Sequence, residues 1–296
     1  MGPRLARVPL GGANVNVEER RVEVQGLPTR YLAAGEGPPL VLLHALAESA
    51  LDWRWVLPAL ARTHSVYAPD LPGFGDSAKP RVDYSPAFFT RFMSGYLDAL
   101  GIERAAVAGN SLGGLVALRL ALSEPERVSA LGLIDSAGLG RAVTYALRAP
   151  TLPGYGELTI TWSRTPPGAT QRAWMRIPLL FARPGSVPPE WIKEQYRLSQ
   201  QPGFLEAALA ALRAQVDLRG QREVLVDRLP DLEMPTLIVW GASDRVFPVS
   251  QAREAAARLA EGSLTLIPDC GHLPHVERPD RFVGALGRFI GEQSND

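Results

Sequence analysis

The N-terminal part of the chain changes from alternating to continuous apolar positions. Apolar and polar residues alternate over residues 14–17, 21–24 and 29–32, as in antiparallel strands with one face in water. After a turn at residues 35–39, the run Leu-Val-Leu-Leu at 40–43 is apolar throughout. Such a run is typical of a strand buried on both faces of a parallel sheet. The pattern therefore predicts an antiparallel hairpin that leads into a buried sheet.

Strands and helices then follow one another regularly. Short apolar runs of the strand type cover residues 65–68, 105–108, 128–134, 235–240 and 263–267. Helical patterns lie between or after them, over residues 51–61, 86–100, 112–122, 250–260 and 279–290. This alternation is typical of an α/β fold with a mostly parallel sheet.

The alternation is interrupted between residues 139 and 217. Prolines are frequent there, and no clear strand pattern is present. The helical pattern that begins at Phe204 places its apolar positions on one face. Because strands resume afterwards, the segment interrupts one sheet instead of separating two domains. We expect residues 1–138 and 218–296 to form one α/β core, with residues 139–217 inserted as a helical cap.

The composition excludes several classes of function. Apolar residues make up 46% of the 296 positions and the formal net charge is zero, so there is no electrostatic footprint for nucleic acid. No apolar run reaches the roughly 18–20 residues that a membrane span needs. Residues 1–7 carry positive charge with no apolar segment behind them, so we expect no signal peptide. The single cysteine, Cys270, excludes an intrachain disulfide and a cysteine-based metal cluster. We expect a cytoplasmic protein whose partner is a small molecule, not a membrane, and which is a monomer or a homodimer.

The sequence Gly-Asn-Ser-Leu-Gly-Gly at residues 109–114 lies between an expected strand and an expected helix. A G-x-S-x-G motif in this context is typical of a nucleophile elbow, a sharp turn that exposes the serine hydroxyl. Glycines two residues before and after the serine let the strand and the helix approach without Cβ clashes. We therefore predict that Ser111 is a nucleophile. A glycine-rich helix start or a phosphate-binding turn is the alternative.

A serine hydroxyl needs a base, and histidine is the usual one because its pKa lies near neutrality. His272 follows the strand expected at residues 263–267, so it lies at the same carboxyl edge of the sheet as Ser111. We predict that His272 is the base. His275, three residues later, is the alternative.

The base in turn needs a carboxylate that holds its tautomer and stabilises the imidazolium. Asp244 follows the strand expected at residues 235–240 and reaches the same edge. We predict this role for Asp244. Asp135, directly after the strand expected at residues 128–134, is its rival.

The order Ser111, Asp244, His272 is the order of the α/β-hydrolase fold. From about residue 22 to residue 290 the chain resembles the capped enzymes of this fold. The matching stretches are those at residues 42–44, 70–77, 109–114, 241–244 and 271–279. The resemblance implies an α/β-hydrolase fold, with a mostly parallel eight-stranded sheet, helices on both faces and an inserted helical cap.

The same resemblance implies an oxyanion hole made of two backbone N–H groups, those of Leu112 and Leu46. Each such donor contributes roughly 10²–10³-fold in rate. The family usually has His-Gly in the first of these loops, whereas this chain has His44-Ala45. If that position needs a positive φ, alanine is strained there by about 1 kcal/mol. His44 is expected to orient the loop or to contact substrate.

A serine nucleophile excludes some of the reactions that enzymes of this fold catalyse. Dehalogenases and epoxide hydrolases of this fold use an aspartate in the elbow, so Ser111 argues against both. We expect a carboxylesterase that cleaves esters of small, apolar substrates through an acyl-enzyme, without metal or cofactor. The alternative is a C–C bond hydrolase of ring-fission dienones, which the motif at residues 109–114 resembles, although those enzymes usually carry tryptophan where Leu273 stands. A lactonase, an amidase, a cofactor-free haloperoxidase and a non-catalytic binding protein are further alternatives.

The expected cap carries aromatic and basic side chains that can contact substrate. We predict that Trp162, Trp174 and Phe181 line an apolar pocket, as small-molecule sites usually are lined. An arginine can bind a substrate carboxylate through two parallel hydrogen bonds. The candidates for that role are Arg148, Arg164, Arg172, Arg176 and Arg183.

Overall fold

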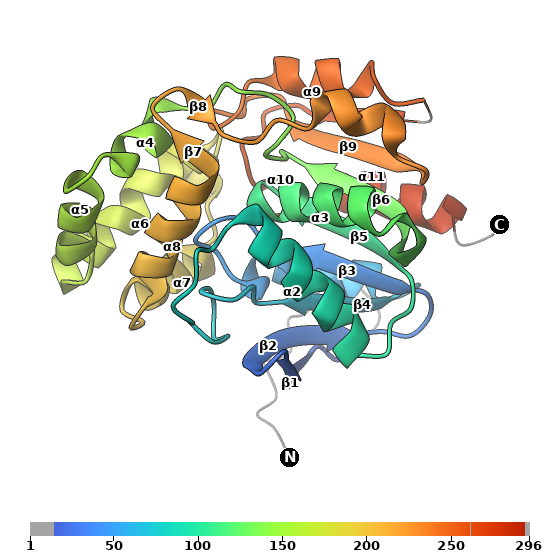
Figure 1. Cartoon of the computed structure of the whole chain (residues 1–296), viewed down its shortest axis with the longest axis horizontal. Helices are drawn as coiled ribbons and strands as arrows, with labels where there is room; N and C mark the ends of the chain where they lie inside the picture. Colours follow the sequence, from blue (N-terminus) through green and yellow to red (C-terminus); the bar gives the residue numbers. More distant parts are fainter. Residues whose placement is uncertain (1–14, 261, 294–296) are drawn as a thin grey trace.

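The computed structural model describes residues 15–260 and 262–293 of the chain. Within them, eight strands form one sheet in the order β1-β2-β4-β3-β5-β6-β9-β10 (Figure 1). Their bounds are β1 Glu18–Val24, β2 Leu27–Ala34, β3 Pro39–Leu43, β4 Ser65–Pro69, β5 Ala105–Asn110, β6 Val128–Ile134, β9 Thr236–Gly241 and β10 Gly262–Ile267. Strand β2 pairs antiparallel with both β1 and β4, and the remaining neighbours pair parallel. The sheet is therefore mostly parallel, as the sequence predicts.

The N-terminal hairpin differs from the expectation. Residues 15–17 are not in a strand, and Asn14 lies outside the described residues. Strand β1 begins at Glu18 and pairs without a break along β2, from Glu18 opposite Ala33 to Val24 opposite Leu27. Pairing with the buried strand β2 thus extends β1 through a polar stretch that has no apolar alternation of its own.

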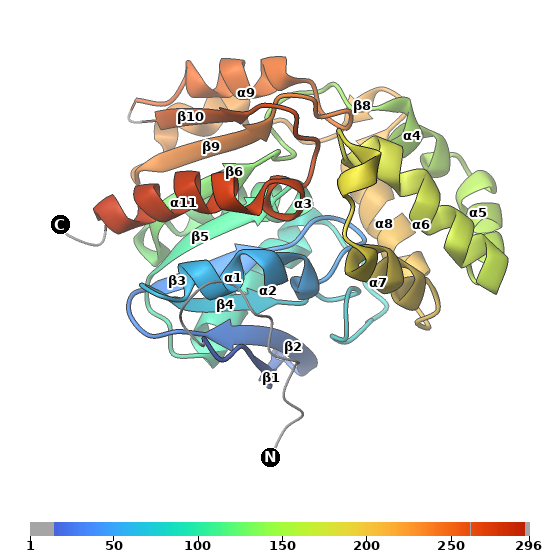
Figure 2. The same cartoon turned by 180° about the vertical axis from the view of Figure 1, so that it is seen from behind.

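Helices cover both faces of the sheet. Helices α2, α3 and α9 lie on one face, and α1 and α11 lie on the other (Figures 1 and 2). Residues of β3 alternate between the two cores: Val41 and Leu43 pack on the first side, Leu40 and Leu42 on the second. This explains why the strand is apolar throughout. The bounds are α1 Leu57–Leu60, α2 Pro86–Ala99, α3 Leu112–Ser123, α9 Val249–Ala256, α10 Pro274–Glu277 and α11 Pro279–Gln293.

The helix expected over residues 51–61 is two short elements, a 3-10 helix at Ala50–Trp55 and α1. Pro58 lies in the first turn of α1. Proline lacks an N–H group and is tolerated in the first turn of a helix but not in its interior. One continuous helix through this position is therefore disfavoured.

Between β6 and β9 the chain leaves the sheet and forms five α-helices within the described residues, which we call the α4–α8 layer. They are α4 Tyr145–Arg148, α5 Tyr155–Ser163, α6 Pro166–Leu180, α7 Pro189–Ser199 and α8 Phe204–Gln215, followed by the short strands β7 Val216–Asp217 and β8 Gly220–Gln221. The layer lies at one end of the sheet (Figures 1 and 2). None of the helices in the part of the chain that is described is long and apolar enough to cross a bilayer.

Candidate active site

Ser111 stands between the end of β5 and the start of α3, in a backbone conformation that is rare for a serine. Its φ is 55° and its ψ is −113°. Two hydrogen bonds hold the turn: the Ser111 N–H donates to Ile134 O at 3.0 Å, and the Ala137 N–H donates to Ser111 O at 3.0 Å. A non-glycine residue in such a region is strained by about 1–3 kcal/mol and persists only when its surroundings fix it. The turn therefore has the geometry expected of a nucleophile elbow.

The glycines of the motif permit this turn. A Cβ on Gly109 would lie 2.1 Å from Gly113 O, and one on Gly113 would lie 2.3 Å from Leu43 O. The strand and the helix thus approach each other more closely than any other residue type allows. This close packing brings the first turn of α3 against the end of β3.

His272 and Asp244 are hydrogen-bonded partners. His272 Nδ1 lies 2.9 Å from Asp244 Oδ2, and both side chains are almost fully buried. The other carboxylate oxygen, Asp244 Oδ1, accepts the Val246 N–H at 2.7 Å. Ser111 and His272 line the same cavity. The three predicted residues therefore meet at one edge of the sheet, with the acid behind the base.

The loop that carries His272 is fixed from two sides. Asn110, the residue before Ser111, donates from Nδ2 to His272 O at 3.0 Å and to Ile134 O at 3.1 Å. The buried Glu277 carboxylate accepts the N–H groups of Gly271 at 2.7 Å, Ala182 at 3.1 Å and Arg183 at 2.8 Å. These bonds tie the His272 loop to the turn at Ser111 and to the end of α6.

The two other candidates for base and acid have different surroundings. The ring of His275 stacks on Trp53 at 4.1 Å between centroids and does not line the cavity. Burial, together with His272, lowers the pKa of His275 to about 3.

Asp135 is fully buried and accepts the Gly241 N–H at 2.9 Å, and no hydrogen bond joins it to His272 in the described residues. Its carboxylate, Asp244 and His272 have ligand-type atoms within 4.8 Å of one another. Since two of the three already bond each other, the grouping fits a catalytic network better than a metal site.

The loop after β3 corrects one expectation. Ala45 does not have a positive φ, but Ala47 does, at 58°. The strained position therefore lies two residues later than expected, and the Arg176 guanidinium holds it by donating to Ala47 O at 3.0 Å. Leu46 lines the cavity beside Ser111, and Leu112 begins α3, where N–H groups have no acceptor inside the helix. Both expected oxyanion donors thus belong to segments that border Ser111.

His44 orients the loop and does not line the cavity. The ring is fully buried; its Nδ1 lies 2.8 Å from Ala45 O, and its Nε2 accepts the Leu71 N–H at 2.9 Å. These two bonds require a proton on Nδ1 and none on Nε2. Burial also lowers the pKa of His44, which keeps the ring neutral. The expected substrate contact of His44 is therefore wrong, and its loop-orienting role is consistent with the bonds.

Only one of the three aromatic candidates lines the cavity. Trp162 on α5 does, although half of its surface is exposed. Trp174 on α6 does not line the cavity and is 58% exposed. Phe181 is buried, packs edge-on against Trp191 at 5.0 Å and is not part of the lining. Trp174 and Phe181 thus lie outside the cavity wall, a placement that sequence alone does not give because it does not tell which face of α6 meets the cavity.

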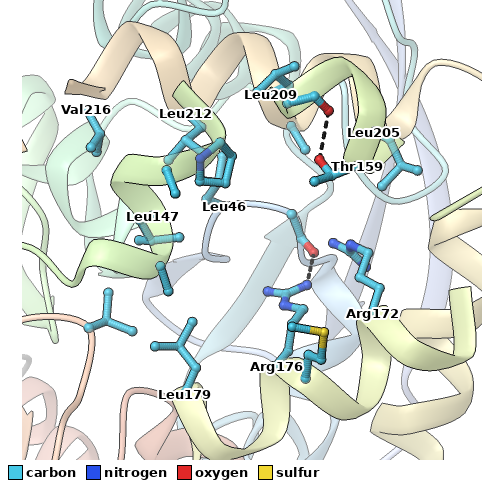
Figure 3. Close-up of a pocket in the computed structure, with 18 of the residues that line it drawn as sticks. Leu46, Leu147, Thr159, Arg172, Arg176, Leu179, Leu205, Leu209, Leu212 and Val216 are labelled. Atoms are coloured by element: carbon cyan, nitrogen blue, oxygen red, sulfur yellow. Dashed lines mark hydrogen bonds between the residues drawn. The ribbon is translucent and has the colours of Figure 1, made fainter. Parts of the chain in front are cut away.

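The cavity has a volume of about 810 Å³ and lies between the sheet edge and the α4–α8 layer. Its wall is mainly apolar, and Figure 3 shows leucine side chains from α4, α6 and α8 around it. The labelled apolar residues are Leu46, Leu147, Leu179, Leu205, Leu209, Leu212 and Val216. A cavity of this kind fits a small, largely apolar molecule.

Two arginines of α6 form a polar corner in this cavity (Figure 3). Arg176 pairs with the buried Glu48 carboxylate at 2.5 Å, and Gln195 donates to the same carboxylate at 2.5 Å. Arg172 donates to Ser199 Oγ at 3.1 Å and has no carboxylate partner among the described residues. Burial and the neighbouring Arg176 lower the pKa of Arg172 to about 9. Glu48 opposes this shift from beyond ion-pair distance, so Arg172 stays charged at neutral pH with no carboxylate in direct contact among the described residues.

Residues 38–279 match the sequence profile of the family described as the alpha/beta hydrolase fold. This match covers most of the chain. The chain belongs to the α/β-hydrolase family. Together with the elbow and the buried His–Asp pair, membership identifies the protein as a hydrolase.

Several members of the α/β-hydrolase family are similar over almost their whole length. The 2-hydroxymuconate semialdehyde hydrolase of a Pseudomonas species (strain CF600) is 33% identical, over 92% of this chain and 94% of that protein. The meta-cleavage product hydrolase of Pseudomonas fluorescens IP01 has a solved structure that superposes with a TM-score of 0.79 at 29% identity, covering 92% of this chain and 97% of that one. A membrane phospholipase A superposes with a TM-score of 0.78 at 28% identity, covering 95% and 87%.

Several residues that shape this hydrolase site were not found from the sequence. Glu48 and Gln195 lie in segments with no motif and become partners of Arg176 only in the folded chain. Asn110 and Glu277 fall within the matching stretches, at fixed distances from Ser111 and His272. That spacing is the signal that could have identified them as supports of the site.

Proposed function

We propose that this hydrolase cleaves a C–C bond in a small conjugated keto acid, a dienoate. Ser111 attacks the ketone carbonyl as His272 takes the hydroxyl proton, and Asp244 holds the imidazolium. The N–H groups of Leu112 and Leu46 stabilise the oxyanion. The bond to the neighbouring carbon then breaks, its electron pair spreads into the conjugated acid, and His272 returns the proton to that carbon. Water activated by His272 releases the acyl group from Ser111 as a carboxylic acid.

The observation that carries this proposal over a simple ester is the guanidinium of Arg172, which bonds Ser199 but contacts no carboxylate in the described part of the chain. A cation in a mainly apolar cavity with no carboxylate in contact is costly, and a substrate carboxylate would offset that cost. Such a pair is strong because both partners are charged. Relatives at 33% and 30% identity are named as hydrolases of 2-hydroxymuconate semialdehyde and of 2-hydroxy-6-oxo-2,4-heptadienoate, and the second name is that of a carboxylate.

Arg176 is not equivalent to Arg172, although the two lie one helical turn apart. Its charge is matched by Glu48, and its second bond to the Ala47 carbonyl fixes the oxyanion loop. We propose that Arg176 positions the loop whereas Arg172 binds the substrate. In this proposal the α4–α8 layer is the cap that residues 139–217 are expected to form, and α6 delivers both arginines.

An ester substrate remains the second candidate because of Leu273. This apolar residue stands directly after His272, where the dienone hydrolases that the motif resembles usually have tryptophan, and it lines the cavity. The same three residues perform ester cleavage, with an alcohol instead of a carbon as the leaving group.

The deciding experiment compares kcat/KM for 2-hydroxy-6-oxo-2,4-heptadienoate with kcat/KM for nitrophenyl esters of graded acyl length. We expect the dienoate to be preferred at least tenfold. In Arg172→Met, loss of one charge-assisted contact of about 1.5–3 kcal/mol should raise KM for the dienoate roughly 10–100-fold. Cleavage of the uncharged esters should change less than about threefold.

Arg164→Met is the matched control, because Arg164 is an exposed arginine that pairs with Glu206 outside the cavity. It should leave both activities as they are. Preference for an ester over the dienoate, with equal effects of Arg172→Met on both substrates, would replace the C–C proposal with the esterase.

A further inference from the structure

A second buried carboxyl group lies behind the Asp244–His272 pair. Asp135 follows β6 and Asp244 follows β9, and these two strands are neighbours in the sheet (Figure 1). Asp135 has no exposed surface and a φ of 40°, a left-handed conformation that the turn after β6 imposes. The carboxyl groups of Asp135 and Asp244 interact directly, and their oxygens lie within 4.8 Å of His272. Nothing in the reaction so far uses Asp135.

The hydrogen-bond donors around the two carboxyl groups are unequal. Asp244 accepts two, from His272 Nδ1 at 2.9 Å and from the Val246 N–H at 2.7 Å. Asp135 accepts one, from the Gly241 N–H to Oδ1 at 2.9 Å. Asp135 Oδ2 is buried and has no donor among the described residues. Two ionised carboxylates cannot donate to each other, whereas a proton on this buried oxygen would give it a partner in the neighbouring carboxylate.

The charges around Asp135 also favour its protonated form. Burial raises the pKa of Asp135 well above its ordinary value of 3.8, and the carboxylates of Asp244 and Glu277 raise it further. The Gly241 N–H opposes this shift more weakly. The Cys270 thiol next to Asp135 has a pKa raised mainly by burial, so it adds no charge at neutral pH. Arg278 acts on this thiol but is not among the main influences on Asp135.

We propose that Asp135 carries a proton on Oδ2 and donates it to Asp244, and so acts as a positioning residue for the acid of the triad. Asp244 then has a third donor that fixes the orientation of its carboxylate toward His272. The pair also bears one negative charge instead of two, which leaves the imidazole free to lose its proton and act as base. The proposal rests on the roles assigned above to Ser111, His272 and Asp244, but not on the identity of the substrate.

The test measures the rate at which a fluorophosphonate labels Ser111, as a function of pH, in wild type, Asp135→Asn and Asp135→Ala. Asparagine keeps a neutral donor at this position, so the rate should stay within about threefold and the midpoint of the acid limb should not move. Alanine removes the donor, and the loss of one hydrogen bond to a charged group should slow labelling roughly 10–100-fold. Asp269→Asn, at an exposed aspartate three residues before His272, is the matched control and should change neither rate nor midpoint.

The contrary result is equally specific. If Asp135 is ionised, Asp135→Asn removes a charge beside the His–Asp pair, and the midpoint should fall by about one to two pH units. That shift, or equal rates for the Asn and Ala variants, would overturn the proposal. Infrared difference spectra of wild type minus Asp135→Asn give a readout that needs no catalysis: the carbonyl band of a protonated carboxyl group is expected, and its absence refutes the proposal. Failure of the wild type to label would instead refute the nucleophile, while the infrared result still decides the proton.

Discussion

Ser111 shows how a single residue combines strain with function. Its φ is 55° and its ψ is −113°, and hydrogen bonds to Ile134, Ala137 and Leu115 hold the backbone in this conformation. Such strain persists because the surrounding structure fixes it. The neighbouring histidines show the opposite arrangement. His44 and His275 are buried and neutral and support the site from behind.

His275 makes stability depend on pH. Its pKa is about 3 in the folded chain, against an ordinary value of 6.5, because burial disfavours the charged ring. As pH falls below about 6.5 the unfolded chain binds a proton that the folded chain does not, so stability is lost; at pH 5 the loss is about 2 kcal/mol. His275→Phe keeps a ring against Trp53 and removes this titration.

Urea unfolding at pH 8 and pH 5 measures the effect. The fall in unfolding free energy between these pH values should be about 2 kcal/mol smaller in His275→Phe than in wild type. Taking the difference between pH values cancels any constant packing effect of the new ring. An equal fall in both proteins would show that the folded chain accepts the proton.

The positions of the candidate site residues were predictable where a motif and a strand end coincide. Ser111, Asp244 and His272 each follow an apolar strand, and parallel strands bring such positions to one edge. The positive φ at Ala47, not Ala45, and the inward burial of His44 were not predictable, because both depend on how the loop meets β4 and α6.

At the scale of elements, the site depends on how closely α3 packs against β3. A Cβ on Gly113 would lie 2.3 Å from Leu43 O and 2.8 Å from His44 O, and neither backbone atom can move without shifting the loop after β3. Gly113→Ala should therefore destabilise the fold by about 1–3 kcal/mol and also slow the labelling of Ser111.

A Gly→Ala substitution in another helix should change stability in the opposite direction. Gly284 lies in α11, and the nearest atom to its Cβ position is 3.8 Å away, at the flexible end of Arg288. Gly284→Ala should stabilise the protein by roughly 0.5–1 kcal/mol without affecting labelling. Melting temperatures of the two variants test the pair. If both substitutions shifted the melting temperature in the same direction, the close packing of α3 against β3 would not be the reason for glycine at position 113.

The order and type of the elements were largely predictable, because buried parallel strands have unbroken apolar runs and helices have their own period. Two elements were not. The polar start of β1 is a strand because it pairs with β2. The helix expected over residues 51–61 is interrupted before Pro58, because proline is tolerated in the first turn of a helix but not in its interior. Both depend on contacts or backbone rules that an apolar pattern does not record.

At the scale of the whole molecule, the site is assembled from two parts of the chain. The sheet edge supplies the proposed nucleophile, base and acid, and the α4–α8 layer supplies most of the cavity wall and both of its arginines. Of the five arginines that the sequence offers for a carboxylate, only Arg172 and Arg176 line the cavity. Of these two, Arg176 pairs with Glu48, whereas Arg172 has no carboxylate in contact among the described residues. The sequence alone does not show which arginines line the cavity, because this depends on which face of α6 turns inward.

The most direct test of the account is the turnover of Ser111→Ala, purified free of wild-type enzyme, on the dienoate and on a nitrophenyl ester. Removing the nucleophile should lower kcat at least about 10³-fold on both substrates while the melting temperature falls by no more than a few degrees. Turnover of either substrate within tenfold of wild type, by folded Ser111→Ala protein, would contradict nucleophilic catalysis by Ser111.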